Sequence, residues 1–482
     1  MINKPVVVGI GNIQQQEKFK DLDEALILMD KATKKAIADS SKEIINYIDE
    51  IRIPKGFWKY RDPGRWIAKN NNFKNNPITY VTKIGILQQN LINQAILNIQ
   101  EGKINASLIV GGESRYKMIR AIKENKEYKE TELNENPDFY VKADADINLD
   151  EEINELSKMA VGYYAIMENA YRFSKNEKLL DHNKKIAELY EGFSEIAHKN
   201  KNGWSKQKYF AKDIIKPSDK NKYQAFPYNK LHCTSWNVNQ ASAIIICNED
   251  IADKLDIPRE QRVYPLVSSE NNHMISLIQR ENIINPVGLK LAAKSIKDTL
   301  TSHKKNIDYY DLYSCFPIAV QMFCDSLNIN LSSSTSITGG MSFAGGPLNH
   351  YVLSSTAQLI EKMRKKKDKI GLITGISGVM TKQSFALWTN NYINNFSFED
   401  VTSKAKQIDK PKALSAESSG TGVIVGYTIL RESNNKKAVI YAESHDGKRV
   451  ILNSRNPVVI KEMENVEWVG KKITFKNGCL VS

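Results

Sequence analysis

The sequence predicts an α/β fold made of two units of similar order, with a helical insertion in the first unit and a small β domain at the C-terminal end. Short apolar runs alternate with stretches of helical period on both sides of the chain's middle. A polar, aromatic-rich stretch of helical period separates these two regions. The last segment holds closely spaced runs rich in Val, Ile, Tyr and Thr. Alternating strands and helices predict a parallel sheet, and closely spaced short strands predict a barrel or sandwich.

The first unit begins with a buried strand and continues by alternation. Apolar residues at helical spacing predict two helices, and Gly102 ends the second of them. The polar stretch between these helices, with Pro54, Pro63 and Pro77, is assigned no element. The expected elements are the strand Pro5–Ile10, the helix Asp23–Ser40, the helix Ile84–Ile99 and the strand Ala106–Val110.

The insertion and the second unit follow in the same manner. In the insertion we expect the helices Leu156–Phe173 and Ile186–His198, and then a strand at Ala241–Cys247 that returns to the first sheet. The second unit is predicted to contain the strands Val263–Leu266, Tyr309–Tyr313 and Ile370–Gly375, and the helices Val287–Thr301, Ala319–Leu327 and Leu348–Met363.

The C-terminal segment is expected to consist of a linker and a β domain. Thr402–Pro411 is rich in Lys, Asp and Ser and is interpreted as the linker. Turn pairs such as Asp446-Gly447 and Asn477-Gly478 separate the later runs. The expected strands are Gly422–Leu430, Ala438–Ser444, Arg449–Leu452, Pro457–Lys461 and Lys472–Phe475.

Composition sets the broad class of protein. The 482 residues exceed one ordinary core, so roughly two to four domains are expected. With 41% hydrophobic and 26% charged residues and no long apolar run, the chain is expected to be globular and without a membrane span. The apolar run near the N-terminus is too short for a signal peptide. Five cysteines without paired spacing favour a reducing compartment, the cytoplasm, and no metal-ligand spacing occurs.

The net charge of +13 has two interpretations. It can serve an acidic partner, such as nucleic acid or a phosphorylated cofactor like coenzyme A. A generally lysine-rich surface is favoured, because Lys, Asn and Ile are used heavily throughout the chain. Nucleic-acid binding by the terminal β domain is not expected, since aromatic residues do not alternate with lysines there.

Two polar turns carry the strongest functional signal. Asp311-Leu-Tyr-Ser-Cys-Phe316 ends a buried strand, and Gly339-Gly-Met-Ser-Phe-Ala-Gly-Gly-Pro347 opens a helix. Glycines at this density imply positive φ or a close backbone approach, either for a substrate-binding loop (Gly339, Gly340, Gly345 and Gly346) or for a tight structural turn. Neither turn contains the histidine that an acyl-transfer nucleophile needs nearby.

These residues, in this order, resemble the thiolase superfamily, and most of all its branch related to sterol-carrier-protein thiolases. The resemblance covers nearly the whole chain. It rests on Val8-Gly-Ile-Gly11, Ile109-Val-Gly-Gly-Glu113, Pro227-Tyr-Asn-Lys230, Asn237-Val-Asn-Gln-Ala241 and the two turns above. It implies two βαβαβαββ halves in a five-layer αβαβα sandwich, with a helical loop domain and an added C-terminal β domain. The implied boundaries are 1–114 with 233–252 for the first half, 115–232 for the loop domain, 253–396 for the second half and 397–482 for the linker and β domain.

The same resemblance places the family's catalytic positions on residues of other types. The nucleophilic cysteine matches Gly85, or, with a shifted register, Ile84, Ile86 or Leu87. The activating histidine matches Gly346, the Asn-Glu-Ala-Phe turn matches Tyr313–Phe316, and the last cysteine-bearing turn matches Gly375 and its neighbours. Without the thiolate and its base, the chain cannot form an acyl-enzyme in the ordinary way.

Other residues near these positions are candidate substitutes, and each of them has a structural alternative. Cys315 is either a displaced nucleophile or a small buried residue behind the site, and Ser314 binds substrate or satisfies turn amides. The phenol of Tyr313 donates a hydrogen bond or simply packs. His350 points into the cavity or lies on a helix surface, and His232 and Cys233 reach the cavity or are structural. The structural role is favoured for all of them except Tyr313, where it is at least as probable.

Two functions follow from the resemblance. The first is a thiolase-like protein of lipid metabolism that acts on acyl-CoA, of the acetyl-CoA acetyltransferase type, with an unusual mechanism. The alternative is a non-catalytic protein that binds CoA or acyl-CoA, or docks a partner such as a hydratase-like or lipid-carrying protein. A homodimer and a monomer are both compatible with the sequence. A pure interaction scaffold would be favoured if side chains filled the cavity.

Overall fold

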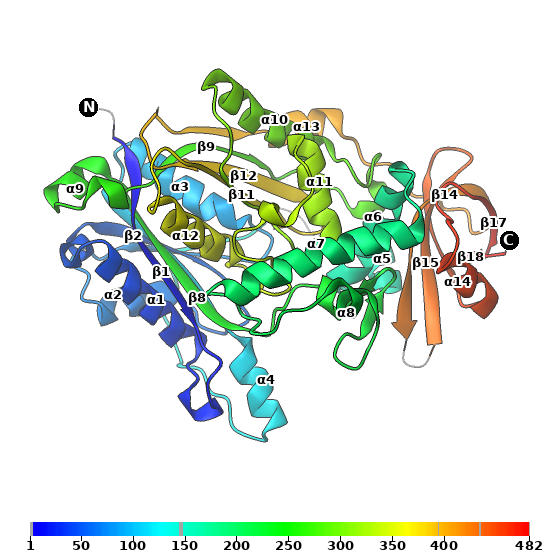
Figure 1. Ribbon diagram of the computed structural model, residues 1–482, viewed down its shortest axis with the longest axis horizontal. Coiled ribbons are helices and arrows are strands. Elements are labelled where there is room, and N and C mark those ends of the chain that lie inside the picture. Colours follow the sequence, from blue (N-terminus) through cyan, green and yellow to red (C-terminus); the bar gives the residue numbers. More distant parts are fainter. Residues whose placement is uncertain (1–2, 144–147, 394, 433–434, 482) are drawn as a thin grey trace.

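Three β-sheets and the helices packed on them make up the computed structural model (Figure 1). The structure describes residues 3–143, 148–393, 395–432 and 435–481. The termini lie at opposite ends of the long axis (Figure 1). No helix in the described ranges is long and apolar enough to cross a membrane.

The first sheet has the order β1-β8-β4-β2-β3-β5. Its strands are β1 (Pro5–Gln14), β8 (Asn239–Asn248), β4 (Ala106–Ser114), β2 (Ile48–Pro54), β3 (Ile78–Thr82) and β5 (Phe139–Val141). Strand β8 runs antiparallel to both β1 and β4, whereas β4, β2, β3 and β5 are mutually parallel. The expectation of a parallel sheet is therefore wrong. The chain leaves the sheet after β4, builds the insertion, and re-enters at the same end in the opposite direction.

The second sheet repeats this order with fewer strands, β10-β11-β12-β9-β13. Its strands are β10 (Tyr309–Asp311), β11 (Ile370–Ser377), β12 (Lys382–Thr389), β9 (Tyr264–Asn271) and β13 (Ser397–Asp400). Strands β9, β12, β11 and β10 correspond to β1, β8, β4 and β2. Within the described residues, an isolated bridge between Asp311 and Ser336 stands where the second half would have a counterpart of β3.

Helices form three layers around these two sheets. Helices α1 (Ala25–Asp39) and α2 (Pro63–Asn70) cover the outer face of the first sheet, and α10 (Val287–Ser302) covers that of the second, with α11 (Pro317–Leu327) beside it. Helices α3 (Gln88–Gln100) and α12 (Tyr351–Met363) contact both sheets, so they form the middle layer. Apolar residues from α3, α12 and both sheets join in one buried cluster there. The αβαβα sandwich with two related halves is confirmed.

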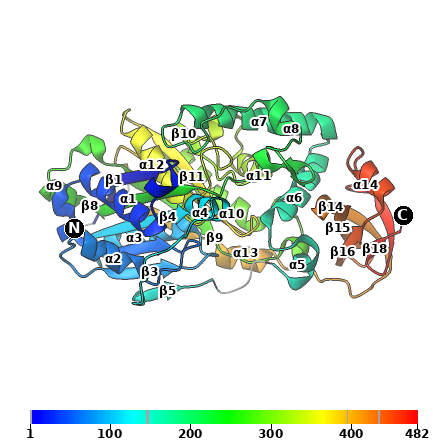
Figure 2. The same ribbon diagram turned by 90° about the horizontal axis from the view of Figure 1, so that it is seen from below.

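The insertion between β4 and β8 is largely helical, as expected. Its helices are α4 (Arg115–Lys123), α5 (Asp150–Leu156), α6 (Ala160–Ser174), α7 (Leu179–Lys199) and α8 (Ala211–Ile215), followed by the short strands β6 (Tyr223–Ala225) and β7 (Tyr228–Asn229). Strand β5 extends the first sheet, and β6 pairs with the C-terminal sheet. In both views α6 lies beside β14 (Figure 2).

The C-terminal segment closes into a small barrel. Its strands are β14 (Gly420–Glu432), β15 (Asn435–Ser444), β16 (Arg449–Ser454), β18 (Cys479–Leu480) and β17 (Lys472–Lys476), and β14 pairs with both β17 and β15. Apolar side chains including Tyr427, Ile440 and Phe475 fill its interior. The predicted β domain is therefore confirmed as a five-stranded barrel.

Three expectations for single segments are wrong. Pro457–Lys461 was expected as a strand, but helix α14 (Pro457–Met463) occupies it, because the Asn456 side chain caps the helix and Pro457 suits its first turn. The polar stretch with Pro54, Pro63 and Pro77 contains β2, α2 and β3. Within the expected linker lies a short helix, α13 (Thr402–Ile408), that packs against β9 and α10.

The remaining regular elements are short. They are helix α9 (Glu249–Lys254) and the 3-10 helices at Phe19–Asp21, Lys42–Asn46, Lys230–His232, Arg259–Gln261, Leu277–Gln279 and Ser333–Thr335.

Candidate functional site

The residues matched to the thiolase site come together at the starts of the two central helices. Helix α3 begins at Gln88, whose side-chain Oε1 accepts a hydrogen bond from the Val352 backbone amide at the start of α12 (2.7 Å). The Tyr313 amide donates to Thr374 Oγ1 (2.8 Å), which joins the first polar turn to β11. The structure therefore gathers both helix starts, the first turn and β11 in one region.

The position matched to the nucleophile contains no sulfur in any of the four registers. Leu87 is the residue that precedes α3, and Gly85 lies two residues earlier with a φ of +112°. The Gly85 carbonyl accepts a hydrogen bond from Lys382 Nζ (2.8 Å) on β12, and Lys382 is buried. The buried Lys382 side chain thus lies beside the start of α3. Lys382 could not be identified from the sequence, because a single lysine at a strand start gives no sign of burial.

The first polar turn is tied down by protein contacts. Ser314 is buried, and its hydroxyl accepts a hydrogen bond from the Met341 amide (3.0 Å), so it satisfies a turn amide. Burial raises the pKa of the Cys315 thiol to about 12, so the thiol stays protonated at neutral pH. The ring of Phe316 stacks on Tyr164 of α6 at a centroid distance of 4.4 Å. The Tyr313 ring packs edge-on against Tyr351.

The glycine-rich turn is closely packed by the insertion. Gly339, Gly340 and Gly345 have positive φ, between +74° and +96°. A Cβ atom on Gly339 would lie 2.3 Å from the Ala197 amide nitrogen of α7, and one on Gly346 would lie 2.1 Å from Thr234 Cγ2. Close backbone approach is therefore confirmed, but the approaching groups are protein atoms.

Thr234 bridges the two turns. Its hydroxyl donates to the Cys315 carbonyl (3.0 Å), and the Gly346 amide donates to the carbonyl of the next residue, Ser235 (2.9 Å). The segment that follows the insertion thus lies across the position matched to the activating histidine. On β11, Gly375 leaves room for Ser384 Oγ, since an added Cβ would lie 2.5 Å from it.

His350 is buried rather than on a helix surface, so the favoured interpretation was wrong. It precedes α12, and its Cβ lies 2.5 Å from the place of a Cβ on Gly111 of β4. Burial lowers the pKa of His350 to about 3, and neither ring nitrogen has a hydrogen-bond partner among the described residues. His350 is thus a neutral imidazole packed against β4, and no hydrogen bond among the described residues links it to Cys315.

His232 and Cys233 have structural contacts. His232 Nδ1 accepts from the Asn229 amide (3.2 Å), and burial lowers the pKa of His232 to about 4. The Cys233 thiol donates to the Asn229 carbonyl (3.4 Å), and burial raises its pKa. Neither side chain forms an activated thiolate–imidazolium pair.

Buried acids hold the site's frame together. Asp311, at the end of β10, accepts hydrogen bonds from Ser336 Oγ (2.7 Å), Thr338 Oγ1 (2.9 Å) and Tyr351 OH (2.9 Å). It therefore joins the turn before α12 to the helix itself. Glu270 of β9 accepts from Asn90 (2.7 Å) and Asn93 (3.1 Å), one turn apart on α3. Burial raises the pKa of both carboxyl groups, although these hydrogen bonds oppose it.

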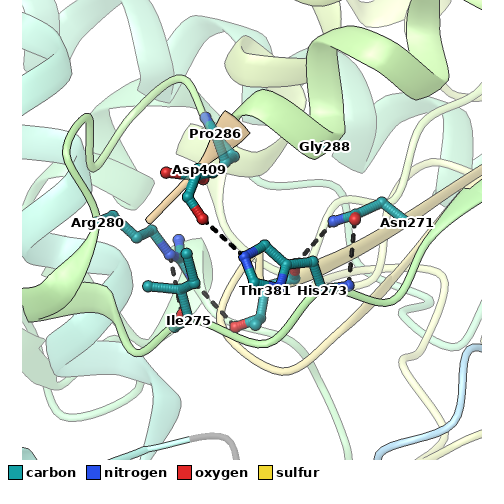
Figure 3. A pocket seen from close by; sticks show the side chains of 8 residues that line it. All are labelled: Asn271, His273, Ile275, Arg280, Pro286, Gly288, Thr381 and Asp409. Atoms are coloured by element: carbon teal, nitrogen blue, oxygen red, sulfur yellow. Dashed lines mark hydrogen bonds between the residues drawn. The ribbon is translucent and has the colours of Figure 1, made fainter. Parts of the chain in front are cut away.

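A small polar pocket lies where β9, β12 and the start of α10 meet (Figure 3). Its volume of about 10 Å³ suits a single water molecule. Arg280 donates to the Val379 carbonyl (2.6 Å) and Thr381 Oγ1 (2.9 Å), and His273 Nε2 lies 3.0 Å from the Asp409 carbonyl oxygen. These groups are satisfied by the protein, so the pocket is a structural feature of the second half.

The described part of the chain contains no candidate metal site. No group of three or more His, Cys, Asp or Glu side chains lies close enough to hold an ion there. All five cysteines are free. The site can therefore offer helix N-termini, backbone amides, hydroxyl groups and one buried lysine.

Comparison with known proteins finds similarity only among solved structures, since no family model and no curated protein matches the sequence. A monomeric SCP2-thiolase like protein type 1 from Mycobacterium smegmatis superimposes over 100% of both chains, with a TM-score of 0.82 and 21% identity. The dimeric peroxisomal thiolase of Saccharomyces cerevisiae covers 81% of this chain and 98% of its own, with a TM-score of 0.54 and 15% identity.

A third structure was solved with a ligand. The Acat5 thiolase from Ascaris suum, in complex with coenzyme A, covers 80% of this chain and 99% of its own, with a TM-score of 0.52 and 14% identity. These three structures share one architecture with the present chain.

Proposed function

From its thiolase fold, we propose that this chain binds coenzyme A or acyl-CoA without performing ordinary thiolase catalysis. The observation that carries the proposal is the combination of an intact frame with absent reactive groups. The starts of α3 and α12 lie side by side, since Gln88 Oε1 accepts a hydrogen bond from the Val352 amide, and helix N-termini favour anionic groups. Yet residues 84–87 contain no cysteine, and Gly346 stands at the histidine position.

Thiolase chemistry needs a thiolate that holds the acyl group and a base that accepts a proton. The thiol nearest the site, Cys315, stays protonated because burial raises its pKa to about 12. His350 is buried against Gly111, and its ring nitrogens form no hydrogen bond with Cys315 or with any other described residue. What remains for an anionic or thioester ligand is the positive ends of the two helices and the backbone amides around them.

Two further observations support a CoA-type ligand. A similar fold binds coenzyme A in the Ascaris suum thiolase. The net charge of +13 also suits a ligand with several phosphates. A reducing compartment such as the cytoplasm would keep the five cysteines free, in agreement with their lack of pairing.

Calorimetric titration of the pure chain with CoA, acetyl-CoA and acetoacetyl-CoA tests the proposal. We expect saturable binding of at least one of them. Incubation with acetoacetyl-CoA and CoA should yield no acetyl-CoA above a protein-free control. Absence of heat and of any thermal shift with all three ligands would refute CoA binding, and steady acetyl-CoA formation would refute the loss of catalysis.

A docking function is the second candidate, and a specific observation favours it. Thr234 and α7 occupy the space over Gly346 and Gly339, where a thioester would need room. If the chain binds no CoA, the same fold serves as a scaffold for a protein partner. This second function predicts that the chain is stably folded and that titration with CoA or acyl-CoA gives no binding heat.

A further inference from the structure

The part of the insertion around α8 carries an exposed group of lysines, which we call the lysine surface. In Figure 2, α7 and α8 lie along one outer edge of the molecule. The lysines of this surface lie on α8, in the loop that follows it and at the next 3-10 helix, and all are exposed: Lys212, Lys216, Lys220, Lys222 and Lys230. The Lys230 amide donates to the Lys222 carbonyl (2.9 Å), so the end of this segment returns to the loop.

The protein does not neutralise the lysine surface. None of its five lysines forms an ion pair with another described residue. On the adjacent helix α7, Glu191 accepts a backbone amide of α8 (2.8 Å), and Glu195 pairs with Lys208 (3.2 Å). Within the segment, Asp213 accepts the backbone amide of the residue before α8 (3.2 Å), and Asp219 is exposed. Five ammonium groups thus accompany two carboxylates, and a net positive charge remains.

Buried amide side chains hold this segment in shape. Asn221 is buried, and its Nδ2 lies between 2.8 and 3.1 Å from the carbonyl oxygens of Asp213, Ile214 and Lys216. From the end of the insertion, Asn229 Nδ2 donates to the Ile215 carbonyl (3.0 Å). The last carbonyls of α8 are therefore satisfied from inside the protein, and the lysine side chains are not needed to cap the helix.

Two large apolar side chains are exposed among these lysines. Phe210 comes directly before α8 and is 46% exposed, and Ile215 is the last residue of α8 and is 38% exposed. The centroid of the Phe210 ring lies 5.3 Å from Lys208 Nζ and 5.9 Å from Lys212 Nζ. An apolar side chain between two ammonium groups suits a boundary between water and lipid, where the ring enters the acyl region and the ammonium groups stay at the headgroups.

We propose that the lysine surface, with Phe210 and Ile215, docks the protein on the surface of a bilayer that contains anionic lipids. Clusters of about four to eight cations are typical of such surfaces. Nucleic acid is a poorer occupant, because residues 206–230 contain no arginine and the exposed part of this surface has a single aromatic ring for base stacking. The inference does not depend on CoA binding at the thiolase-type site.

Sedimentation of the full chain with lipid vesicles tests the inference. We expect binding to phosphatidylcholine vesicles that contain about 30% phosphatidylserine, at about 0.1 M NaCl, and no binding to phosphatidylcholine alone. Raising NaCl to about 0.5 M should release the chain, because salt screens the attraction. Equal binding to both kinds of vesicle, or binding to neither, would overturn the inference.

Two double variants locate the contact. Lys212→Gln combined with Lys216→Gln should weaken binding to the anionic vesicles roughly thirtyfold, about fivefold for each lysine. Lys404→Gln combined with Lys406→Gln removes the same charge from exposed positions of α13 and should leave binding unchanged. Equal weakening by both double variants would show that net charge alone attracts the chain, and would overturn the assignment to this surface.

A second pair of variants tests the apolar part of the surface. Phe210→Ser should weaken vesicle binding at least about fivefold, because the half-exposed ring no longer enters the lipid. Val458→Ser, at a 75% exposed position of α14, should have no effect. Circular dichroism checks that both variants are folded. Unchanged binding by Phe210→Ser would overturn insertion of the ring.

Duplex DNA and polyglutamate separate a membrane from other polyanions. We expect the chain to bind the anionic vesicles more tightly than either polymer at the same salt concentration. Binding to duplex DNA or polyglutamate without binding to vesicles would overturn the membrane assignment in favour of a nucleic acid or an acidic protein.

Discussion

The glycine-rich turn at Gly339–Gly346 and an open hollow of about 290 Å³ between α6 and β14 differ in what occupies the space next to them. At the turn, the Ala197 backbone of α7 and the Thr234 methyl group fill the space that the glycines leave. At the hollow, the large apolar side chains of Phe173 and Val423 stay more than one-third exposed. Glycines at a helix start therefore indicate close approach by any group, protein atoms included, and do not by themselves mark a ligand site.

The largest effect is expected at the turn itself. Gly339→Ala would force a side chain onto a φ of +94° and place Cβ 2.3 Å from the α7 backbone. We expect a loss of roughly 4 kcal/mol in the free energy of unfolding, from about 1–3 of backbone strain and about 1–3 of overpacking. Urea unfolding followed by circular dichroism measures it. Gly447→Ala, at φ +78° with nothing within 4 Å, is the control and should cost only about 1 kcal/mol.

A loss below about 1 kcal/mol for Gly339→Ala would mean that the α7 backbone leaves room for a side chain at residue 339. That result would contradict the close packing of α7 against the turn.

The next effect concerns the buried contacts that hold α7 in place. His182 of α7 lies between two carboxylates, 2.6 Å from Glu168 of α6 and 2.5 Å from Glu177. Burial lowers the pKa of His182, but the hydrogen bonds and charges of both glutamates outweigh burial and raise it. Burial also raises the pKa of Glu168, but its bonds to His182, Tyr228 and Gln321 outweigh this and lower it.

His182→Gln should therefore lower the free energy of unfolding by about 3 kcal/mol near pH 6, because a buried carboxylate loses its charged partner. The histidine's contribution is complete below its ordinary pKa of 6.5 and disappears as pH rises through the raised value in the folded state. The glutamate's contribution is present above 4.5 and disappears as pH falls through its lowered value.

The difference in the free energy of unfolding between wild type and variant should therefore be largest between pH 4.5 and 6.5, and smaller at pH 9. Urea unfolding at several pH values measures this difference. A gap that grows steadily up to pH 9 would contradict a charged histidine.

A smaller effect is expected when an imidazole is placed at residue 346, the position matched to the family's histidine. Gly346→His brings Cβ within 2.1 Å of Thr234 Cγ2, so we expect a loss of about 1–3 kcal/mol from overpacking. Thiolysis of acetoacetyl-CoA should stay at the level of the wild type, because residues 84–87 contain no cysteine. Recovery of thiolysis by this single change would show that another nucleophile is in place.

The smallest effect concerns the thiols. Cys479 is exposed, whereas Cys315 is buried with its pKa raised to about 12. Iodoacetamide at pH 8 should alkylate Cys479 and leave Cys315 unmodified in the folded chain, as peptide mass spectrometry would show. Rapid alkylation of Cys315 would indicate an open, activated site at the first turn.

The sequence predicted the strands that are buried on both faces, because their apolar runs are continuous, as in Ala241–Cys247. It missed β2, where Glu50 and Arg52 interrupt the apolar pattern. These two side chains form a buried ion pair (Nε–Oε1, 2.6 Å), so their burial depends on each other and not on hydrophobicity.

The sequence located the segments around the candidate site but not their contacts. Apolar periodicity and glycines mark both turns, and they placed the two helix starts three or four residues early, at Ile84 and Leu348 instead of Gln88 and Tyr351. The burial of His350 could not be predicted, because Gly111 of a distant strand creates it. The position of Thr234 over Gly346 likewise follows from where the insertion returns to the core.

Native mass spectrometry of the chain mixed with acetoacetyl-CoA tests the central claim most directly. We expect a noncovalent complex that dissociates on denaturation and leaves the 54.7 kDa chain unmodified. A chain that retains an acetyl group after denaturation, or one that forms no complex at any ligand concentration, would contradict it.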